Sequence, residues 1–293
     1  MAELQTNLNS IGPSGPDRNP AVSIGMPVYN GAKYIRDALD SLLAQTFADF
    51  ELIISDNAST DETQKICEEY AQHYLSIKYF RQNSNIGAAA NFEFVLNKAV
   101  GEYFMWAACD DIRSSDFLDL NIRFLRQNSE YLASTSPVKF REAEFSEITM
   151  GDASLDSDNR YERIVQLFRC WHANGRFYSL FRRSVLIDCQ FSKLKFIGAD
   201  WALITRLANI GKFKRIHSGC VQLGKDGVSN STDIFTSHRA TLKDLILPFN
   251  KLSVDTWEYM VGANILQKLR LLFFLLRLNL QAFVYQFYVM YKR

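Results

Sequence analysis

Two adjacent carboxylates, Asp110 and Asp111, follow an apolar run of the chain. Carboxylates are preferred ligands of hard divalent cations such as Mg²⁺ or Mn²⁺, which keep their other positions for water and phosphate oxygens. In an arbitrary sequence an Asp-Asp pair more often lies in a solvated turn or caps a helix. Here the pair follows a predicted buried strand and lies near other polar clusters, so we interpret it as a metal site.

Other residues have types suited to binding a nucleotide or moving a proton. Asp56 ends an apolar run, where its carboxylate could accept hydrogen bonds from a base N–H, and the Tyr29 ring could stack on a base or ribose; turn formation and packing are the alternatives. The loop 83–87 opens a helix whose free N–H groups suit an anion, although Gly87 also suits a turn. Asp200 begins a later helix, where it could cap that helix or act as a general base.

The elements that must position these residues alternate between strands and helices. Apolar runs predict strands at 21–26, 50–55, 77–81 and 103–108, and helical periodicity fills the intervals between them. This order predicts an α/β fold with a mostly parallel sheet covered by helices on both faces, and ligands bind such sheets beyond the carboxyl ends of the strands. The four polar clusters at 29–30, Asp56, 85–87 and 110–111 all follow strands of this set.

The second half of the chain has a less regular pattern. Helices are expected around 117–125, 161–168 and 201–210, with strand-like stretches at 178–181 and 213–216. Ser59 and Glu62 have the spacing of a capping box for the helix that runs to about residue 73.

Composition excludes several classes of protein. The chain has 33 basic and 32 acidic residues, so no overall charge favours nucleic acid as a partner. Five widely spaced cysteines without a CxxC pair, and four histidines without metal-ligand spacing, favour neither a disulfide framework nor a zinc site, and a reducing cytoplasm is the expected compartment. GxSxG, HExxH, P-loop and GxGxxG motifs do not occur in the sequence.

Several motifs in order resemble those of family 2 glycosyltransferases, which are inverting enzymes of the GT-A fold. The run VSIGMPVYN at 22–30 and the run IISDNASTD at 53–61 carry the resemblance. It continues through Asn85-Ile86-Gly87, the stretch 99–103, Cys109-Asp110-Asp111 and Gly198-Ala199-Asp200-Trp201. It covers about residues 21–216. The usual Asp-x-Asp is Ala108-Cys109-Asp110 here, the carboxylate often found before the base is Ala199, and the usual Ala-Arg-Asn is Ala89-Ala90-Asn91.

The resemblance implies a role for each matching residue. A nucleotide-diphosphate sugar, with UDP, GDP or dTDP, would bind through a set at the strand ends: Pro27, Val28, Tyr29, Asn30, Asp56, Asn85, Gly87 and Asp110. Asp110 with Asp111 would hold Mg²⁺ or Mn²⁺, and Asp200 would be the catalytic base. Lys225, in the loop 223–227, could meet the diphosphate, although a solvated lysine is the commoner outcome. The acceptor would be a glycan or a lipid-linked molecule, in cell-surface polysaccharide or glycolipid assembly.

Two other functions are consistent with parts of the pattern. The incomplete acidic motif and Ala199 would suit a non-catalytic nucleotide-sugar or glycan-binding protein, against which the retained Asp56, Asp110 and Asp200 argue. A nucleotidyltransferase would need a glycine-rich first loop with a following Arg and Lys, which the sequence lacks.

The ends of the chain differ from the rest. Residues 1–20 are polar and predict a disordered tail, 21–225 the GT-A domain, and 226–293 a helical C-terminal region. There, Ile265, Leu269, Leu272, Leu276, Leu280, Phe283 and Phe287 follow helical spacing, with a polar stripe of Gln267, Arg270, Arg277 and Gln281 opposite. We expect a helix that lies on an anionic membrane surface, with packing on the domain or in a homodimer as the alternatives. The polar residues make spanning less favourable.

Overall fold

The computed structural model describes residues 18–141, 144, 150–169, 173–187, 189, 191–194, 196–224, 235 and 241–292 of the chain. The predicted N-terminal tail therefore lies mostly outside the described residues, as does Lys225. Side chains of residues 191 and 289–292 are also outside the description.

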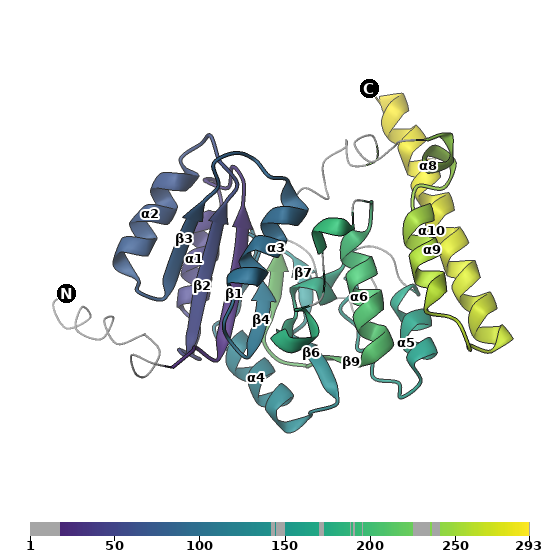
Figure 1. Cartoon of the computed structure of the whole chain (residues 1–293), viewed down its shortest axis with the longest axis horizontal. Helices are drawn as coiled ribbons and strands as arrows, with labels where there is room; N and C mark the ends of the chain where they lie inside the picture. Colours follow the sequence, from purple (N-terminus) through teal and green to yellow (C-terminus); the bar gives the residue numbers. More distant parts are fainter. Residues whose placement is uncertain are drawn as a thin grey trace.

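A seven-stranded sheet forms the centre of the molecule, in the order β3-β2-β1-β4-β8-β6-β9 (Figure 1). The four predicted strands are β1 (Val22–Val28), β2 (Phe50–Asp56), β3 (Ile77–Arg81) and β4 (Tyr103–Trp106), and they pair in parallel. The helices between them are α1 (Ile35–Leu43), α2 (Thr63–His73) and α3 (Ala88–Lys98). The predicted α/β fold with a mostly parallel sheet is confirmed.

Alternate side chains of these strands fill two separate cores. Leu52 and Ile54 of β2 pack with α1 and α2 on one face, whereas Ile53 packs with α3 on the other. Because both faces are covered, β1, β2 and β4 are buried along their whole length, whereas the edge strand β3 is only partly buried. The carboxyl ends of β1 and β2 therefore form a fixed edge that carries the polar loops.

The second half of the chain completes the sheet with mixed strand directions. After α4 (Phe117–Gln127) come β6 (Tyr131–Thr135), β8 (Leu180–Arg182) and β9 (Lys212–Arg215), and β8 runs antiparallel to both β4 and β6. The sequence predicted a strand at 178–181. Instead, residues Gly175–Tyr178 form the short 3₁₀ helix η2, and the strand begins at Leu180.

A small second sheet, absent from the sequence-based expectation, has the order β5-β10-β7. Its strands are β5 (Ile112–Arg113), β7 (Val138–Phe140) and β10 (Val221–Leu223). Two further short 3₁₀ turns, η3 (Arg183–Val185) and η4 (Phe191–Lys193), follow β8. This sheet brings residue 224 beneath the acidic pair that follows β4.

Helices cover the remaining core and the C-terminal side. They are α5 (Arg160–Leu167), α6 (Ala199–Ile210), α8 (Leu242–Ile246), α9 (Asn250–Glu258) and α10 (Ile265–Lys292). Figure 1 shows α9 and α10 side by side at the edge far from β3, in agreement with the contacts of α6 with α9 and of α10 with α5 and α8.

The expected capping box at the start of α2 is wrong. The helix begins at Thr63 after Glu62, which makes no side-chain cap bond. The Ser59 hydroxyl instead accepts the N–H of Asn30 at 2.9 Å, because the loops after β1 and β2 lie against each other.

Candidate functional site

The carboxylate of Asp56 is fully buried where β2 ends. Its oxygens accept the N–H of Ser59 at 2.8 Å, the hydroxyl of Tyr79 at 2.9 Å and a guanidinium N–H of Arg81. Arg81 also donates to the carbonyl of Ser59 at 2.9 Å, yet about a third of its side chain (34%) is exposed. The group of this cluster that reaches the surface is therefore a cation fixed by Asp56.

The loop after β1 presents an aromatic ring beside this cluster. Tyr29 is 50% exposed, whereas Pro27 and Val28 are buried inside β1, so their side chains do not reach a surface ligand. Asn30 has a left-handed backbone with φ 51°, and its side-chain oxygen accepts the N–H of Thr60 at 2.8 Å. These bonds hold the loop that carries Tyr29.

The loop at 85–87 is fastened to the end of β2 by paired amides. Asn57 donates to Asn85 Oδ1 at 2.9 Å, and Asn57 Oδ1 accepts the N–H of Ile86 at 2.8 Å. Gly87 has φ 85°, a backbone conformation that glycine adopts readily. Its N–H donates a hydrogen bond to Asn85 Oδ1 at 2.9 Å. The N–H of Gly87 is thus engaged within the loop, and an anion here would meet the first turn of α3 instead.

Asp110 and Asp111 lie on top of the small sheet. Asp110 is 8% exposed and Asp111 3% exposed. The N–H of Gly224, directly after β10, donates to Asp111 Oδ1 at 3.1 Å. A Cβ on Gly224 would lie 2.6 Å from the Cβ of Asp110 and closer still to its carboxylate, so only glycine leaves room for Asp110 in this position.

Burial raises the pKa of Asp111 to about 7; the nearby positive charge of Arg113 opposes this rise, and the negative charge of Asp110 adds to it. Asp111 Oδ2 is buried without a hydrogen-bond partner among the described residues. Arg113, itself buried, donates to the carbonyl of Trp106 at 2.9 Å. Two crowded carboxylates with an unsatisfied oxygen and a raised pKa are the electrostatic setting that a divalent cation relieves.

Asp200 lies in the first turn of α6, after Gly198 in a left-handed conformation. Asn174 Nδ2 donates to Asp200 Oδ2 at 2.9 Å. The positive end of a helix favours the ionised form of a carboxylate. Burial instead raises the pKa of Asp200, and the bond from Asn174 and the backbone N–H groups only partly offset it.

Tyr178 lies in η2, the segment between the acidic pair and Asp200 in the sequence. Burial raises its pKa far above the ordinary value, and the charges of Asp111, Asp110 and Asp200 all add to that rise. The 3₁₀ helix η2 contacts α6, which begins with Asp200, and β4, the strand that the acidic pair follows. Asn174, directly before η2, is bonded to Asp200, so this segment links the predicted base to the strand that carries the predicted metal pair.

Comparisons with known proteins identify the family of this chain. The sequence model described as Glycosyl transferase family 2 matches residues 23–189, more than half of the chain. The chain belongs to this family. Residues matched include Asp56, Asp110, Asp111 and Tyr178, whereas Asp200 lies beyond the matched range.

Curated relatives match a shorter part of the chain. An uncharacterised glycosyltransferase of Rickettsia typhi is 38% identical over 109 residues, which are 37% of this chain and 33% of that protein. The putative glycosyltransferase EpsE of Bacillus subtilis is 34% identical over 113 residues, which are 38% of this chain and 41% of that protein. These matches span less than half the length of either relative.

Solved structures share the GT-A fold at low sequence identity. S. aureus TarS in complex with UDP-GlcNAc has a TM-score of 0.62 at 18% identity, covering 85% of this chain and 69% of that one. The mannosyltransferase PcManGT from Pyrobaculum calidifontis, in complex with GDP-Man and Mn²⁺, has a TM-score of 0.54 at 17% identity, covering 94% and 86%. The fold expected from the family motifs is confirmed.

Sequence reasoning missed four residues of this site. Arg81 could have been noticed as a cation at the end of a predicted strand, in line with Asp56. Asn174, Tyr178 and Gly224 carried no such signal, because they lie outside the regular β-α alternation and reach the site only through η2 and the second sheet.

Proposed function

We propose that this family 2 protein transfers a sugar from a nucleotide-diphosphate donor to an acceptor hydroxyl, with inversion at the anomeric carbon. The observation that carries the proposal is that η2 and Asn174 link Asp200, at the start of α6, to β4, the strand that Asp110 and Asp111 follow. A single displacement requires that the diphosphate leaving group is stabilised and that the acceptor hydroxyl loses its proton. The acidic pair would serve the first purpose and the separate carboxylate the second.

The donor nucleotide binds, in this proposal, along the ends of β1, β2 and β3. Tyr29 stacks on the base or ribose, and the guanidinium of Arg81, oriented by Asp56, donates to the base. Neighbours of the same fold bind UDP-GlcNAc, UDP and GDP-Man, which supports a nucleotide-sugar donor and leaves the base open among UDP, GDP and dTDP.

Asp110 and Asp111 fit a divalent cation, Mn²⁺ or Mg²⁺. Their oxygens are hard ligands, and the unsatisfied Oδ2 of Asp111 has no other partner in the described part of the chain. No cluster of three or more His, Cys, Asp or Glu side chains occurs among the described residues, so the protein would supply these two carboxylates and leave other positions to phosphate and water. When bound, the cation would neutralise charge on the diphosphate.

Asp200 accepts the proton of the acceptor hydroxyl as that oxygen attacks. Its raised pKa makes it a stronger base than an ordinary aspartate, and the bond from Asn174 fixes the direction of its carboxylate. The raised pKa of Tyr178 keeps its hydroxyl protonated near neutral pH, so this hydroxyl can donate a hydrogen bond to a sugar or phosphate oxygen.

The test is incubation with labelled UDP-, GDP- and dTDP-sugars and Mn²⁺, first for release of nucleoside diphosphate and then with candidate glycan and lipid-linked acceptors. We expect one donor class to be consumed, excess EDTA to stop its consumption, and the product to have the opposite anomeric configuration. Donor binding without any release would favour the non-catalytic alternative. Turnover that persists in EDTA would contradict the metal assignment, and retention would contradict the single displacement.

A cytoplasmic setting at the membrane, in assembly of cell-surface polysaccharide or glycolipid, is the part of this proposal that rests on family resemblance. The acceptor would then be a growing glycan or a lipid-linked sugar.

A further inference from the structure

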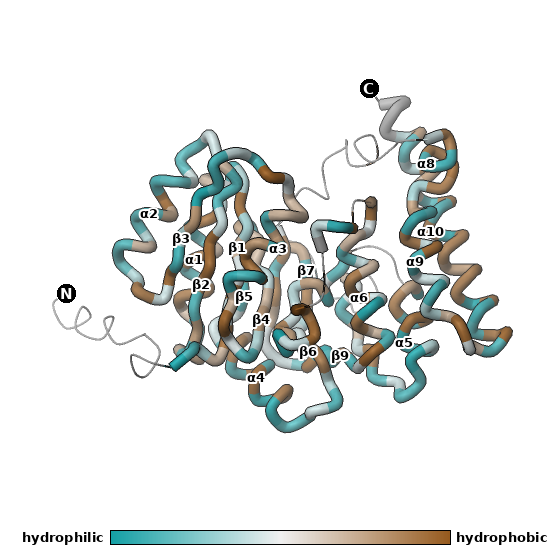
Figure 2. The backbone as a smooth tube through the Cα atoms, in the orientation of Figure 1, coloured by the Kyte–Doolittle hydropathy of each residue, from teal (hydrophilic) through white to brown (hydrophobic). Residues whose placement is uncertain are grey.

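The outward side of α10 is apolar along its whole described length. Leu269, Leu272, Leu276 and Leu280 are between 41% and 62% exposed, and eleven apolar side chains described on this helix are at least 41% exposed. A soluble monomer seldom leaves so long a continuous apolar stripe in water. Figure 2 shows brown segments recurring along α10 on the outer edge of the molecule. We call this stripe the outer face of α10.

Polar bonds on the inward side fix which face of α10 points outward. Asn279 is buried, accepts the N–H of Phe249 at 2.9 Å and donates to Ser253 at 3.1 Å. Arg270 pairs with both oxygens of Glu162 on α5 at 2.9 Å. Two members of the predicted polar stripe, Gln267 and Arg270, therefore face the protein. Rotating the helix to hide its leucines would break these bonds, so the exposure of the outer face is built into the fold.

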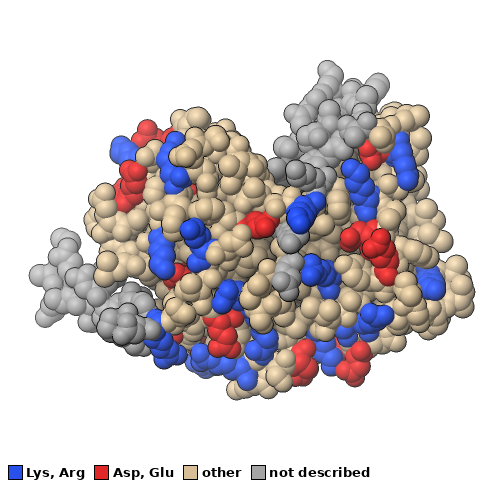
Figure 3. All heavy atoms as spheres, viewed as in Figure 1, with Lys and Arg blue, Asp and Glu red and all other residues tan. Residues whose placement is uncertain are grey.

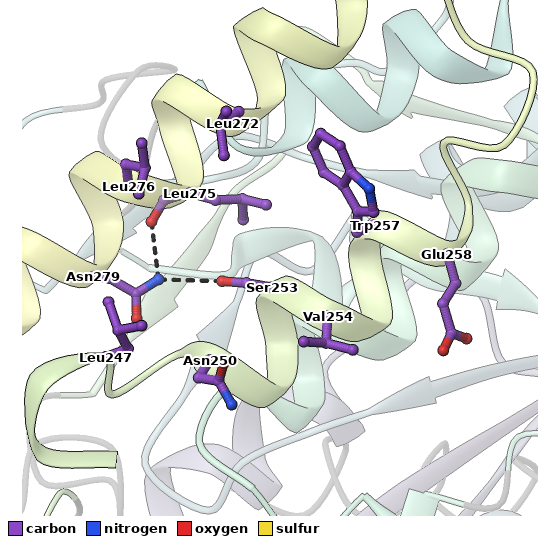
Figure 4. Close-up of a pocket in the computed structure, with 10 residues that line it drawn as sticks. All are labelled: Leu247, Asn250, Ser253, Val254, Trp257, Glu258, Leu272, Leu275, Leu276 and Asn279. Atoms are coloured by element: carbon purple, nitrogen blue, oxygen red, sulfur yellow. Dashed lines mark hydrogen bonds between the residues drawn. The ribbon is translucent and has the colours of Figure 1, made fainter. Parts of the chain in front are cut away.

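A hollow of about 330 Å³ lies between α9 and α10 and opens into this face (Figure 4). Leu272 and Leu276 of the outer face line it together with Trp257, which is 41% exposed. None of the residues lining it belongs to the candidate catalytic site, so it is not the donor pocket. Its apolar walls and its continuity with the outer face suit a hydrocarbon chain.

Charge distinguishes this end of the molecule from the rest. Residues 241–293 include seven basic and three acidic side chains, whereas residues 1–240 include 26 basic and 29 acidic ones. In Figure 3 the edge where α10 lies is mostly uncharged, and both basic and acidic side chains lie beside it. An apolar stripe with surrounding positive charge is complementary to anionic lipid headgroups over acyl chains.

We propose that the outer face of α10 binds the surface of an anionic bilayer, with the helix in the membrane plane and an acyl chain entering the hollow beside Trp257. The segment Ile265–Tyr288 is long and apolar enough to span a membrane. Spanning would expose Arg270 and Asn279 to hydrocarbon and remove their partners on α5 and α9, whereas an in-plane orientation keeps every one of these bonds.

This surface is also connected to the catalytic side of the molecule. Asn279 bonds to Phe249, and Phe249 and Leu252 of α9 lie against Gly198, two residues before Asp200. If α10 binds the bilayer, only the layer formed by α9 would separate the start of α6 from the lipid. The proposal itself does not depend on sugar transfer.

The experiment uses the full chain and vesicles of phosphatidylcholine with or without phosphatidylglycerol. We expect the protein to float with the anionic vesicles, more weakly with neutral ones, and Trp257 emission to shift to the blue on binding. A combined variant, Leu269→Gln, Leu276→Gln and Leu280→Gln, should bind anionic vesicles at least about tenfold more weakly. The reason is that each substitution removes an apolar side chain that would be buried in the lipid. These positions are exposed, so thermal stability should change little.

Leu75→Gln is the matched control, since Leu75 is 95% exposed between α2 and β3, away from α10. It should bind vesicles like the unmodified chain, and both variants should bind nucleoside diphosphate normally. A chain that stays unbound with anionic vesicles would overturn the proposal. The proposal would also be overturned if the unmodified chain formed a stable dimer by light scattering, did not bind vesicles, and became monomeric in the combined variant.

Discussion

Replacing Gly224 by alanine tests whether the acidic pair is the functional centre. The added methyl group would lie 2.6 Å from the Cβ of Asp110 and nearer to its carboxylate. Carbon atoms in contact normally lie about 3.5–4.0 Å apart, so Asp110 or the end of β10 must move by about 1 Å. The backbone N–H that Gly224 donates to Asp111 is displaced by the same movement.

The expected cost follows from that displacement. A misplacement of about 1 Å at a reacting centre lowers rates about 100-fold, and loss of a supporting contact lowers metal affinity about 10- to 100-fold. We therefore expect Gly224→Ala to lower sugar transfer about 100-fold and Mn²⁺-dependent binding of nucleoside diphosphate at least about tenfold. Calorimetric titration of the nucleotide in MnCl₂ measures the second effect without knowledge of the acceptor. Overpacking costs about 1–3 kcal/mol, so the protein should remain folded.

Gly211→Ala provides the control. Gly211 directly follows α6, and a methyl group there would lie 2.3 Å from Leu132 Cγ, a comparable overlap with a side chain that can move. It should reduce stability similarly and leave nucleotide affinity unchanged. If Gly224→Ala binds and transfers as the unmodified chain does, the acidic pair is not held by this contact and does not bind the diphosphate.

Three further changes test the other parts of the site. Asp200→Asn should bind the donor normally and lose transfer at least about 100-fold in single-turnover assays, and undiminished transfer would assign the base elsewhere. Asn174→Ala removes a hydrogen bond that lowers the pKa of Asp200, so that pKa should rise further. The acid limb of the profile of kcat against pH should therefore move to higher pH. A limb that does not move would mean that Asn174 does not act on the catalytic base. Arg81→Met should weaken nucleotide binding about tenfold in the calorimetric titration described above. An unchanged affinity would mean that the nucleobase binds away from Arg81 and Asp56.

The parallel half of the fold was predictable because every signal in it is local. Apolar runs such as 50–55 form strands buried on both faces, and the parallel pairing of these strands then places their carboxyl ends at one edge of the sheet. The positions of Tyr29, Asp56 and the acidic pair follow from that geometry. Their roles remain predictions, since the motifs indicate the family and the experiments above address each residue.

The rest of the site depends on contacts between distant segments. Leu180 begins a strand that is antiparallel to β4, and three residues such as Val221–Leu223 are too short to give a periodic signal. Burial of Asp200 outweighed the helix dipole, because the sequence shows the helix end but not the groups that cover it. The outward face of α10 was likewise set by Glu162 and Phe249, partners that lie 108 and 30 residues away in the sequence.

Trp106 has a mechanical consequence for the whole candidate site. Its indole N–H donates to the carbonyl of Phe92 on α3 at 3.0 Å, its ring stacks on Phe177 with centroids 4.7 Å apart, and its carbonyl accepts from Arg113. The indole and the backbone carbonyl of this one residue thus connect α3, the segment beside Asn174 and β5, directly after the acidic pair. Sliding these elements apart would break all three contacts. Adaptation to a different sugar would instead have to come through the loops that surround this joint.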